Sequence, residues 1–260
     1  MRNNPPVVEV HLTTIDGVRI GATWIPRSQD TAFVVVHGFT GSRGTARMSA
    51  IIDVLQRHGS VCAIDMRGHG TSSGATTLGM DEVLDVDAAV EFVRGQGVDR
   101  VVTIGFSMGG AVVVRHAAGA AAEHHSPRHR VDAIASVSAP AFWFYRGTRI
   151  MRIVHAIVES PVGRLAMHAR GTTITDQPWP TPPPLSPEGA AALIDVPFLI
   201  VHGDSDHYFP MEHPRALERA SEGNPHRSVL IVPGLRHAES GISIESVDTI
   251  ARWGRAPVRR

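Results

Sequence analysis

Residues 101–114, with the sequence VVTIGFSMGGAVVV, constrain the fold more than any other part of the chain. The first of these residues are apolar or β-branched, as in a strand that is buried on both faces, and those from Met108 onward suit a helix packed behind that strand. Ser107 lies at the junction. Gly105 and Gly109 have no Cβ, so the strand and the helix can approach closely around a strained turn. The pattern predicts a serine hydroxyl held out at the carboxyl end of a sheet.

The setting of this serine matters as much as the motif. Five-residue patterns with two glycines also arise by chance in a chain that contains 25 glycines. Here a predicted strand precedes the serine and a predicted helix follows it, which is the setting that a nucleophilic serine at a strand-to-helix turn requires. We therefore interpret Ser107 as a candidate nucleophile. The backbone N–H of Met108, the first residue of the helix, is expected to face the place where an oxyanion would form.

The composition is that of a globular chain without strong net charge. A chain of 260 residues with 43% hydrophobic residues can bury a sizeable core, and we expect one α/β domain that carries an insertion. The 25 basic and 25 acidic residues cancel, so no overall field attracts nucleic acid or an anionic membrane. Every basic residue is an arginine, which excludes Schiff-base chemistry and the lysine of a phosphate-binding P-loop.

The cysteine content and the amino terminus bear on the compartment. Cys62 is the only cysteine, so no internal disulfide forms, and its apolar neighbours predict a buried structural thiol. The first six residues, MRNNPP, lack the apolar core of an export signal, and no later stretch approaches the roughly 20 apolar residues that span a bilayer. We expect a cytoplasmic protein without a transmembrane segment, and the oligomeric state stays open.

Apolar and alternating runs predict strands that are separated by helices. Strands are expected at residues 7–14, 18–26, 31–36, 60–65, 101–104, 131–137, 196–203 and 228–232. Helices are expected at residues 47–57, 80–94, 108–122, 211–221 and 243–253. The dipeptide Asp16-Gly17 predicts a hairpin that joins the first two strands into an antiparallel edge.

The regular alternation breaks between residues 140 and 195. Four aromatic residues in a row follow a strand end, and a helix-like run begins at Ile150. The proline-rich segment 177–187 cannot be a helix or a central strand, because proline lacks the N–H donor. We interpret residues 140–195 as a lid between the core segments 1–139 and 196–260; a helical layer that merely packs on the core is the alternative. The residues expected to line an apolar acyl or aryl pocket are Phe142, Trp143, Phe144, Tyr145, Ile150 and Trp179.

The loop at residues 37–42, with the sequence HGFTGS, follows a predicted buried strand. Its two glycines allow the backbone to bend so that the N–H of Phe39 faces Ser107. Together with the N–H of Met108 it would complete a two-donor oxyanion hole. A plain connection between a strand and a helix is the alternative.

A serine hydroxyl needs partners to act as a nucleophile near neutral pH. An imidazole must take its proton, and a carboxylate must orient that imidazole and stabilise its charged form. Asp206 and His237 follow predicted strands, as Ser107 does, and loops at the carboxyl ends of parallel strands converge on one edge of a sheet. Of the 15 histidines, His237 is the one that follows the final strand. His207 is expected to be a bystander near the mouth of the pocket.

Two other patterns point away from cofactors. His124, His125 and His129 lie in a predicted polar turn with no cysteine or carboxylate cluster at ligand spacing, so we expect a solvated loop and no metal site. The glycines after the strand at residues 60–65 have the wrong spacing for a dinucleotide fingerprint, and no helix follows promptly. Asp65, Arg67 and His69 are instead expected to brace that loop through local hydrogen bonds.

Together these motifs resemble the α/β-hydrolase superfamily, and most closely its small lidded serine esterases and monoacylglycerol-lipase-like hydrolases. The resemblance covers essentially the whole chain. It rests on five ordered segments, which are His37-Gly38-Phe39, 65–72 (DMRGHGTS), 105–110 (GFSMGG), 202–210 (HGDSDHYFP) and 234–237 (GLRH). It implies a mostly parallel eight-stranded central sheet flanked by helices, with a small lid. The family pattern places the acid three residues after the glycine of His-Gly, which favours Asp206 over Asp204.

The resemblance implies acyl transfer to water through an acyl-enzyme, with a small-molecule ester as substrate and no metal or organic cofactor. Ser107 argues against dehalogenases and epoxide hydrolases of the superfamily, which have an aspartate at this position. Thioesterases, acyltransferases, carbon–carbon bond hydrolases and cofactor-free peroxidases share the serine and stay open as alternatives. A ligand-binding scaffold without chemistry is the alternative from another class, and it usually lacks one member of the triad.

Overall fold

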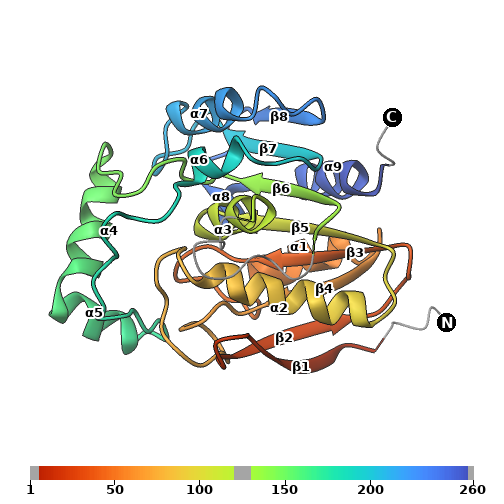
Figure 1. The fold of residues 1–260 in the computed structure, drawn as a ribbon, viewed down its shortest axis with the longest axis horizontal. Coiled ribbons are helices and arrows are strands. Elements are labelled where there is room, and N and C mark those ends of the chain that lie inside the picture. Colours follow the sequence, from red (N-terminus) through yellow and green to blue (C-terminus); the bar gives the residue numbers. More distant parts are fainter. Residues whose placement is uncertain (1–5, 120–129, 257–260) are drawn as a thin grey trace.

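The computed structural model of the protein describes residues 6–119 and 130–256. Its described strands form one eight-stranded sheet with the order β1-β2-β4-β3-β5-β6-β7-β8 (Figure 1). The strands are β1 (Val8–Thr13), β2 (Arg19–Ile25), β3 (Thr31–Val36), β4 (Ser60–Ile64), β5 (Arg100–Phe106), β6 (Ala133–Val137), β7 (Phe198–Gly203) and β8 (Arg227–Val232). Strand β2 pairs antiparallel with both of its neighbours, and the pairings from β4 to β8 are parallel.

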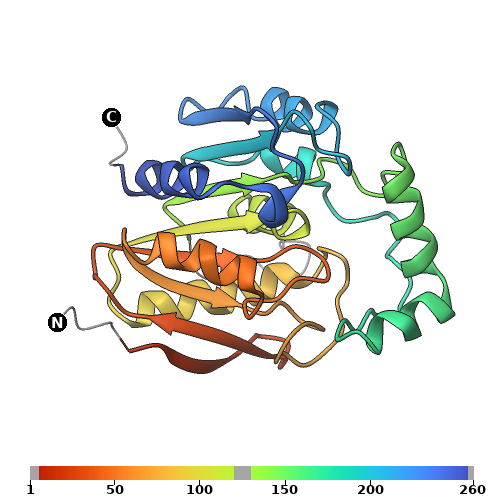
Figure 2. The ribbon, with the colours of Figure 1, turned by 180° about the vertical axis from the view of Figure 1, so that it is seen from behind.

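Helices cover both faces of the sheet. One face carries α2 (Glu82–Gly95), α3 (Met108–Ala117), α6 (Pro187–Ala191) and α7 (Glu212–Ala220), seen in front in Figure 1. The other carries α1 (Ala46–Leu55), α8 (Ala238–Gly241) and α9 (Ile244–Arg255), seen in front in Figure 2. The expected α/β architecture, with a mostly parallel eight-stranded sheet between helices, is confirmed.

The strand sequences explain this layering. All six residues of β3 are buried, as are the last six of β5, because helices cover both of their sides. Val90 and Val112 pack in the apolar cluster on the α2–α3 face, and Leu55 and Ile250 pack in the cluster on the α1–α9 face. Removing such side chains from water is the main favourable term in folding. The two apolar clusters therefore hold the sheet between them, and the ends of its central strands are held rigidly.

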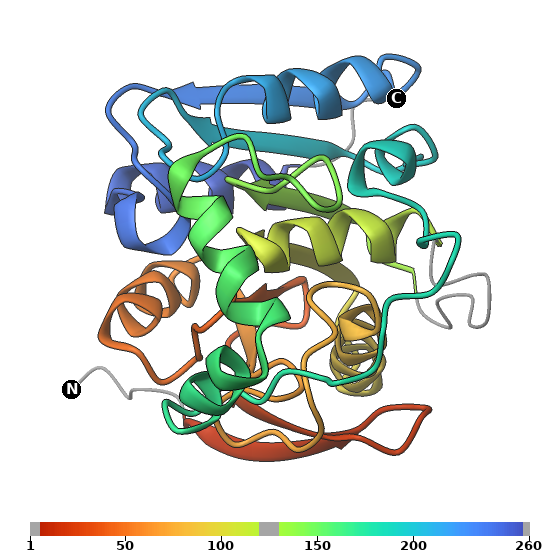
Figure 3. The same ribbon diagram turned by 90° about the vertical axis from the view of Figure 1, so that its left-hand side faces the viewer.

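Helices α4 (Arg149–Glu159) and α5 (Pro161–His168) lie beyond the carboxyl ends of the strands. Seen from that side, α4 crosses in front of the strand ends and α5 follows it (Figure 3). Val158 is the buried residue of α4 and Met167 that of α5, whereas Val162 is 76% exposed. Isolated bridges, His69 with Thr172 and Thr76 with Ile174, join the segment after α5 to the loop that follows β4. The two helices thus form a thin layer rather than part of the core.

Helix α3 is shorter than predicted. Helix α3 ends at Ala117 and not near residue 122, because Gly119 adopts a positive φ of 67° and its N–H donates to the carbonyl of His116. A glycine in this left-handed conformation ends a helix. The predicted turn with His124, His125 and His129 lies outside the described residues. Within the described ranges, no helix is long and apolar enough to cross a membrane.

Candidate active site

Ser107 occupies the sharp turn between β5 and α3. Its φ of 51° and ψ of −117° are strained for a residue with a side chain, and its N–H donates to the carbonyl of Val137. A Cβ on Gly109 would lie 2.5 Å from the carbonyl oxygen of His37, and one on Gly105 would collide with the backbone of Gly109. Only glycine fits at these two positions. Close packing of β3, β5 and α3 therefore holds the serine in its strained conformation.

Three strand-end loops bring a serine, a histidine and an aspartate together. The Nε2 atom of His237 lies 2.9 Å from Oγ of Ser107, and its Nδ1 atom lies 2.8 Å from Oδ2 of Asp206. The side chain of Asp206 is fully buried, and that of His237 is 13% exposed. This is the geometry of a hydroxyl that can pass its proton to an imidazole oriented by a carboxylate.

The carboxylate of Asp206 is held by the loop that carries it. Its Oδ1 atom accepts hydrogen bonds from the N–H groups of Tyr208, at 2.8 Å, and Phe209, at 3.0 Å. Its Oδ2 atom, which accepts from His237, also lies 3.7 Å from Nε2 of His202. Burial lowers the pKa of His202, and its ring donates to the carbonyl of Phe209. The carboxylate of Asp206 is therefore held by donors from its own loop and from His237.

The neighbouring candidates lie elsewhere. Asp204 is exposed, and its Oδ1 accepts a hydrogen bond from the N–H of Gly234 at 2.7 Å. It braces the turn before the histidine and does not contact the imidazole. His207 is also exposed. The structure therefore brings Asp206, and not Asp204, to His237.

The loop after β3 lies against the serine. A Cβ on Gly38 would be 3.1 Å from Cβ of Ser107, so the loop backbone and the serine are in close proximity. Phe39 is half-buried, and its N–H donates to no other group among the described residues. Met108 is the first residue of α3, so its N–H has no partner within the helix. Among the described residues, the N–H groups of Phe39 and Met108 are therefore both without a backbone acceptor, one in the loop beside the serine and one directly after it.

Comparison with known proteins agrees with this geometry. A family model described as alpha/beta hydrolase fold matches residues 31–152, which include Phe39 and Ser107 but neither Asp206 nor His237. The chain is an α/β-hydrolase-fold protein. The fold that the motifs indicated is thereby confirmed. A search of curated proteins found no significant match.

Solved structures with the α/β-hydrolase fold superpose over nearly the whole chain. An esterase from Pyrococcus furiosus gives a TM-score of 0.72 at 22% identity, covering 95% of this chain and 91% of its own. A protein from Butyrivibrio proteoclasticus, solved with ferulic acid bound, gives 0.64 at 20% identity, covering 94% and 96%. A serine hydrolase from Xanthomonas campestris, described as having no lid, gives 0.59 at 19% identity, covering 95% and 93%.

Two buried histidines shape the loop after β3 in this α/β-hydrolase fold. Nε2 of His37 accepts the N–H of Met66, so its Nδ1 carries the proton and donates to the carbonyl of Gly38 at 2.7 Å. His69 accepts the N–H of Thr40 in the same way. Burial lowers the pKa of both rings, that of His37 to about 4. As expected, Asp65, Arg67 and His69 brace the second loop, with Asp65 accepting the N–H of Thr71 and Arg67 pairing with Asp85.

Tyr208 is a contact that the sequence analysis missed. Its ring stacks on the imidazole of His237, with centroids 4.1 Å apart and an interplanar angle of 20°. Its carbonyl accepts a hydrogen bond from Oγ1 of Thr148, the N-cap residue of α4. Tyr208 therefore contacts both the imidazole of His237 and the N-cap residue of α4. The sequence signal was an aromatic residue two positions after the aspartate.

The six residues expected to line a pocket form two clusters and one separate site. Trp179 lies edge-on to Trp143 and Phe144, with ring centroids 4.9 Å away in both pairs. Phe142 and Tyr145 instead pack against His213 of α7. Ile150 is half-buried at the start of α4. The first cluster is close to the residue that follows Ser107, because a Cβ on Gly79 would lie 3.6 Å from the ring of Trp143 and 3.8 Å from Cγ of Met108.

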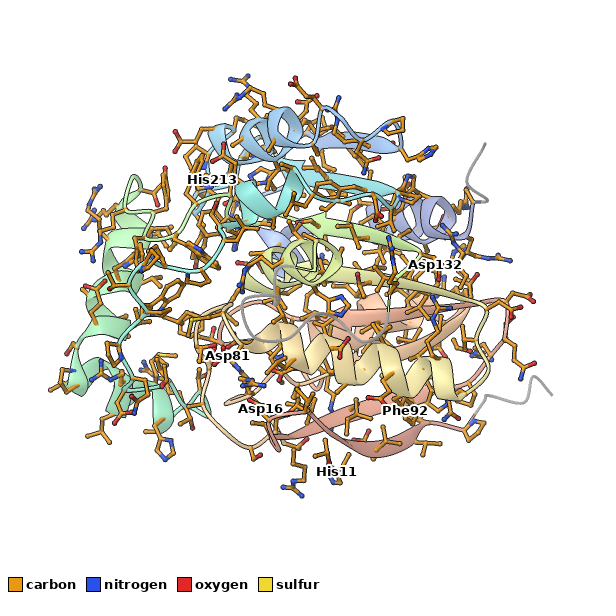
Figure 4. The ribbon with its side chains drawn as sticks, in the orientation of Figure 1. His11, Asp16, Asp81, Phe92, Asp132 and His213 are labelled. Carbon is orange, nitrogen blue, oxygen red and sulfur yellow. The ribbon has the colours of Figure 1, made fainter. Side chains whose placement is uncertain are left out.

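The burial of His213 predicts that the stability of the fold depends on pH. His213 lies toward the side of the molecule that carries α4 (Figure 4), fully buried, and its Nδ1 accepts the N–H of Ala141 at 3.0 Å. Burial, with a smaller effect from His202, lowers the pKa of His213 to about 4. The unfolded chain therefore binds a proton near the usual pKa of 6.5, whereas the folded protein binds it only near pH 4. The stability of the folded state falls as the pH falls from about 6.5 towards 4.

We expect this residue to cost about 2 kcal/mol of stability when the pH drops from about 7 to about 5. In the His213→Asn variant the amide oxygen can still accept the N–H of Ala141 but does not titrate. Urea unfolding at both pH values should show a loss that is smaller by this amount in the variant. Equal losses in wild type and variant would contradict the assignment of a depressed pKa. Comparing the two proteins cancels the contributions of titrating groups that do not interact with His213.

Metal ligation has no candidate in the part of the chain that the structure describes. No group of three or more histidine, cysteine, aspartate or glutamate side chains there could hold an ion. Cys62 is buried, as predicted, and burial raises the pKa of its thiol to about 12.

Proposed function

We propose that the protein is a serine hydrolase that cleaves carboxylic esters through an acyl-enzyme. The observation that carries this proposal is the unbroken hydrogen-bond chain from Oγ of Ser107 through His237 to Asp206. The esterases and serine hydrolases of the same fold support it. An idle scaffold has no need for a fully buried carboxylate aligned with an imidazole beside a strained serine.

In the first half of the reaction Oγ of Ser107 attacks the ester carbonyl carbon while Nε2 of His237 takes its proton. The negative charge moves to the carbonyl oxygen, where the N–H groups of Phe39 and Met108 stabilise it. When the tetrahedral intermediate collapses, the bond to the alcohol oxygen breaks and His237 protonates the leaving alcohol. The ion pair with Asp206 stabilises the imidazolium that exists between these two transfers.

In the second half a water molecule attacks the acyl-enzyme. His237 removes its proton, the same two N–H groups hold the oxyanion, and the proton returns to Oγ of Ser107 as the acid leaves. Each turnover therefore consumes one ester and one water and restores all three side chains. No step requires a group that the chain does not provide.

We further propose that residues 140–195 act as a lid and that the substrate carries an apolar acyl or aryl group. Trp143, Phe144 and Trp179 provide a mostly apolar surface, and Trp143 brings it close to Met108. The guanidinium of Arg115 lies 5.3 Å from the ring of Trp143 and donates to the carbonyl of Leu185, which ties this surface to α3. Such a surface favours apolar over small polar acyl groups.

The test is a panel of p-nitrophenyl esters with short, long and aromatic acyl groups, together with an acyl thioester and an anilide. We expect kcat/KM to rise by at least about tenfold from the acetyl to the longer apolar esters, since each buried methylene contributes about 0.8 kcal/mol. The Trp179→Ala variant should lose most of that gain and keep its activity on the acetyl ester. Equal kcat/KM across the esters would refute the apolar pocket, and a preference for the thioester would reassign the reaction class.

A further inference from the structure

Glu239 connects the general base to the loop that carries the oxyanion donor. It lies two residues after His237, in α8, and its Oε1 atom accepts the backbone N–H of Gly38 at 3.0 Å. The two residues are 201 positions apart in the chain. No motif of the sequence points to Glu239, and the hydrogen-bond chain from Ser107 to Asp206 does not include it.

The glutamate is itself held firmly. Its backbone carbonyl accepts a hydrogen bond from Nε of Arg47 at 2.7 Å, and a second guanidinium nitrogen of Arg47 donates to the carbonyl of Ile242. The preceding N–H, of Ala238, donates to Oγ of Ser138 at 3.0 Å. Helix α8 is thus fixed to α1 and to the end of β6, so its glutamate can serve as a fixed point for a neighbouring loop.

The carboxylate fills the space beside the loop next to the serine. A Cβ on Gly38 would lie 3.1 Å from Oε1 of Glu239 and 3.1 Å from Cβ of Ser107. A Cβ on Gly41 would also lie 3.1 Å from Oε1. The loop therefore has glycines at the two positions where it meets the carboxylate of Glu239. The φ and ψ angles of glycine are less restricted than those of any other residue.

Both peptide groups that flank Gly38 are held by hydrogen bonds. Glu239 accepts the N–H of the first, and the carbonyl of the second accepts from Nδ1 of His37, at 2.7 Å, and from the N–H of Gly41. That second peptide group ends in the N–H of Phe39, which stays free among the described residues. Fixing both groups holds the peptide plane that carries this donor in one orientation.

We propose that Glu239 is a positioning residue that aligns the Phe39 N–H with the oxyanion of the reaction. The proposal rests on the proposed serine-hydrolase function. Within the described residues no cation lies within ion-pair distance of its carboxylate. The role therefore needs an acceptor oxygen at the right reach, and it does not need a negative charge.

Three substitutions separate these requirements. Glu239→Gln keeps an oxygen at the same reach without charge, Glu239→Asp keeps the charge one methylene short, and Glu239→Ala removes both. With p-nitrophenyl butyrate we expect kcat to fall about 10- to 100-fold in the Asp and Ala variants, since the oxyanion donor is misaligned and not deleted. The Gln variant should stay within about threefold of wild type, and KM should change by less than about twofold throughout. Glu91→Ala, an exposed carboxylate on α2, is the control and should behave as wild type.

The outcomes are distinguishable. Ala or Asp variants with full kcat would overturn the proposal, and so would a Gln variant as slow as Ala beside an active Asp variant, because charge would then be the requirement. If Glu239→Ala fails to fold in a thermal melt, the isosteric Gln and the Asp variant still decide. If the wild type is active and the Glu239 variants are unaffected, only the positioning role is refuted. Absence of Ser107-dependent turnover in the wild type removes the proposed function, and this role with it.

Discussion

The Asp206→Asn variant is expected to hydrolyse its best ester about 10⁴-fold more slowly than the wild type, with a loss in kcat and little change in KM. An asparagine at this position has almost the same shape, but it can present an N–H₂ donor to Nδ1 of His237. The imidazole would then keep its proton on Nε2 and donate to Ser107 where it must accept. The wrong tautomer, and not a distorted site, causes the loss.

The matched control for this variant is Asp204→Asn, the same change two residues earlier in the same loop. Asp204 is exposed, and within residues 6–119 and 130–256 it bonds to the N–H of Gly234 and the hydroxyl of Ser205. An asparagine oxygen can accept both of these bonds, so its activity should stay within about threefold of wild type. A large loss in Asp204→Asn beside a mild one in Asp206→Asn would reverse the assignment of the acid. Initial rates at neutral pH are sufficient for the comparison.

The Gly109→Ala variant should lose about 3 kcal/mol or more of folding stability together with nearly all activity. The added Cβ would lie 2.5 Å and 2.6 Å from the carbonyl oxygens of His37 and Val36, which are backbone atoms at the end of β3. Neither can move without opening the pairing of β3 with β5. The helix must instead shift away from the sheet, and it carries Met108 and the turn at Ser107 with it.

Gly95→Ala is the control for this change. Gly95 is the exposed last residue of α2, and a Cβ there meets no atom within 4 Å. Alanine is the better helix former, so this variant should match or exceed wild-type stability by up to about 1 kcal/mol. Thermal melts should therefore place Gly109→Ala roughly 10 °C below the wild type and Gly95→Ala at or slightly above it. Equal melting temperatures would mean that the strand and the helix do not need their close approach.

Much of the fold and of the site geometry was predictable because short-range patterns specify it. The uniform burial of β3 and β5 gives long apolar runs, and the two glycines around Ser107 mark a turn that few other structures require. Asp206 and His237 follow strands of the same parallel sheet, so their convergence on one edge follows from topology alone. The catalytic role that we assign to them remains a proposal.

The features that the sequence analysis missed depend on contacts between distant segments. No local pattern relates Glu239 to Gly38, because the carboxylate is placed by the packing of α8 against α1. The stacking of Tyr208 on His237 depends in the same way on where two loops end in space. The aromatic tetrad shows the reverse case. Its residues are adjacent in sequence, but the two inner rings pack against Trp179 and the two outer rings pack against His213.

Covalent labelling tests the central claim most directly. A fluorophosphonate reacts with a serine only when an imidazole takes the proton of its hydroxyl and an oxyanion site receives the phosphonyl oxygen. Mass spectrometry of the treated wild type should find one adduct per chain on the peptide that contains Ser107, and none after the Ser107→Ala change. An unlabelled wild type, or an adduct on another residue that survives in the alanine variant, would contradict the account.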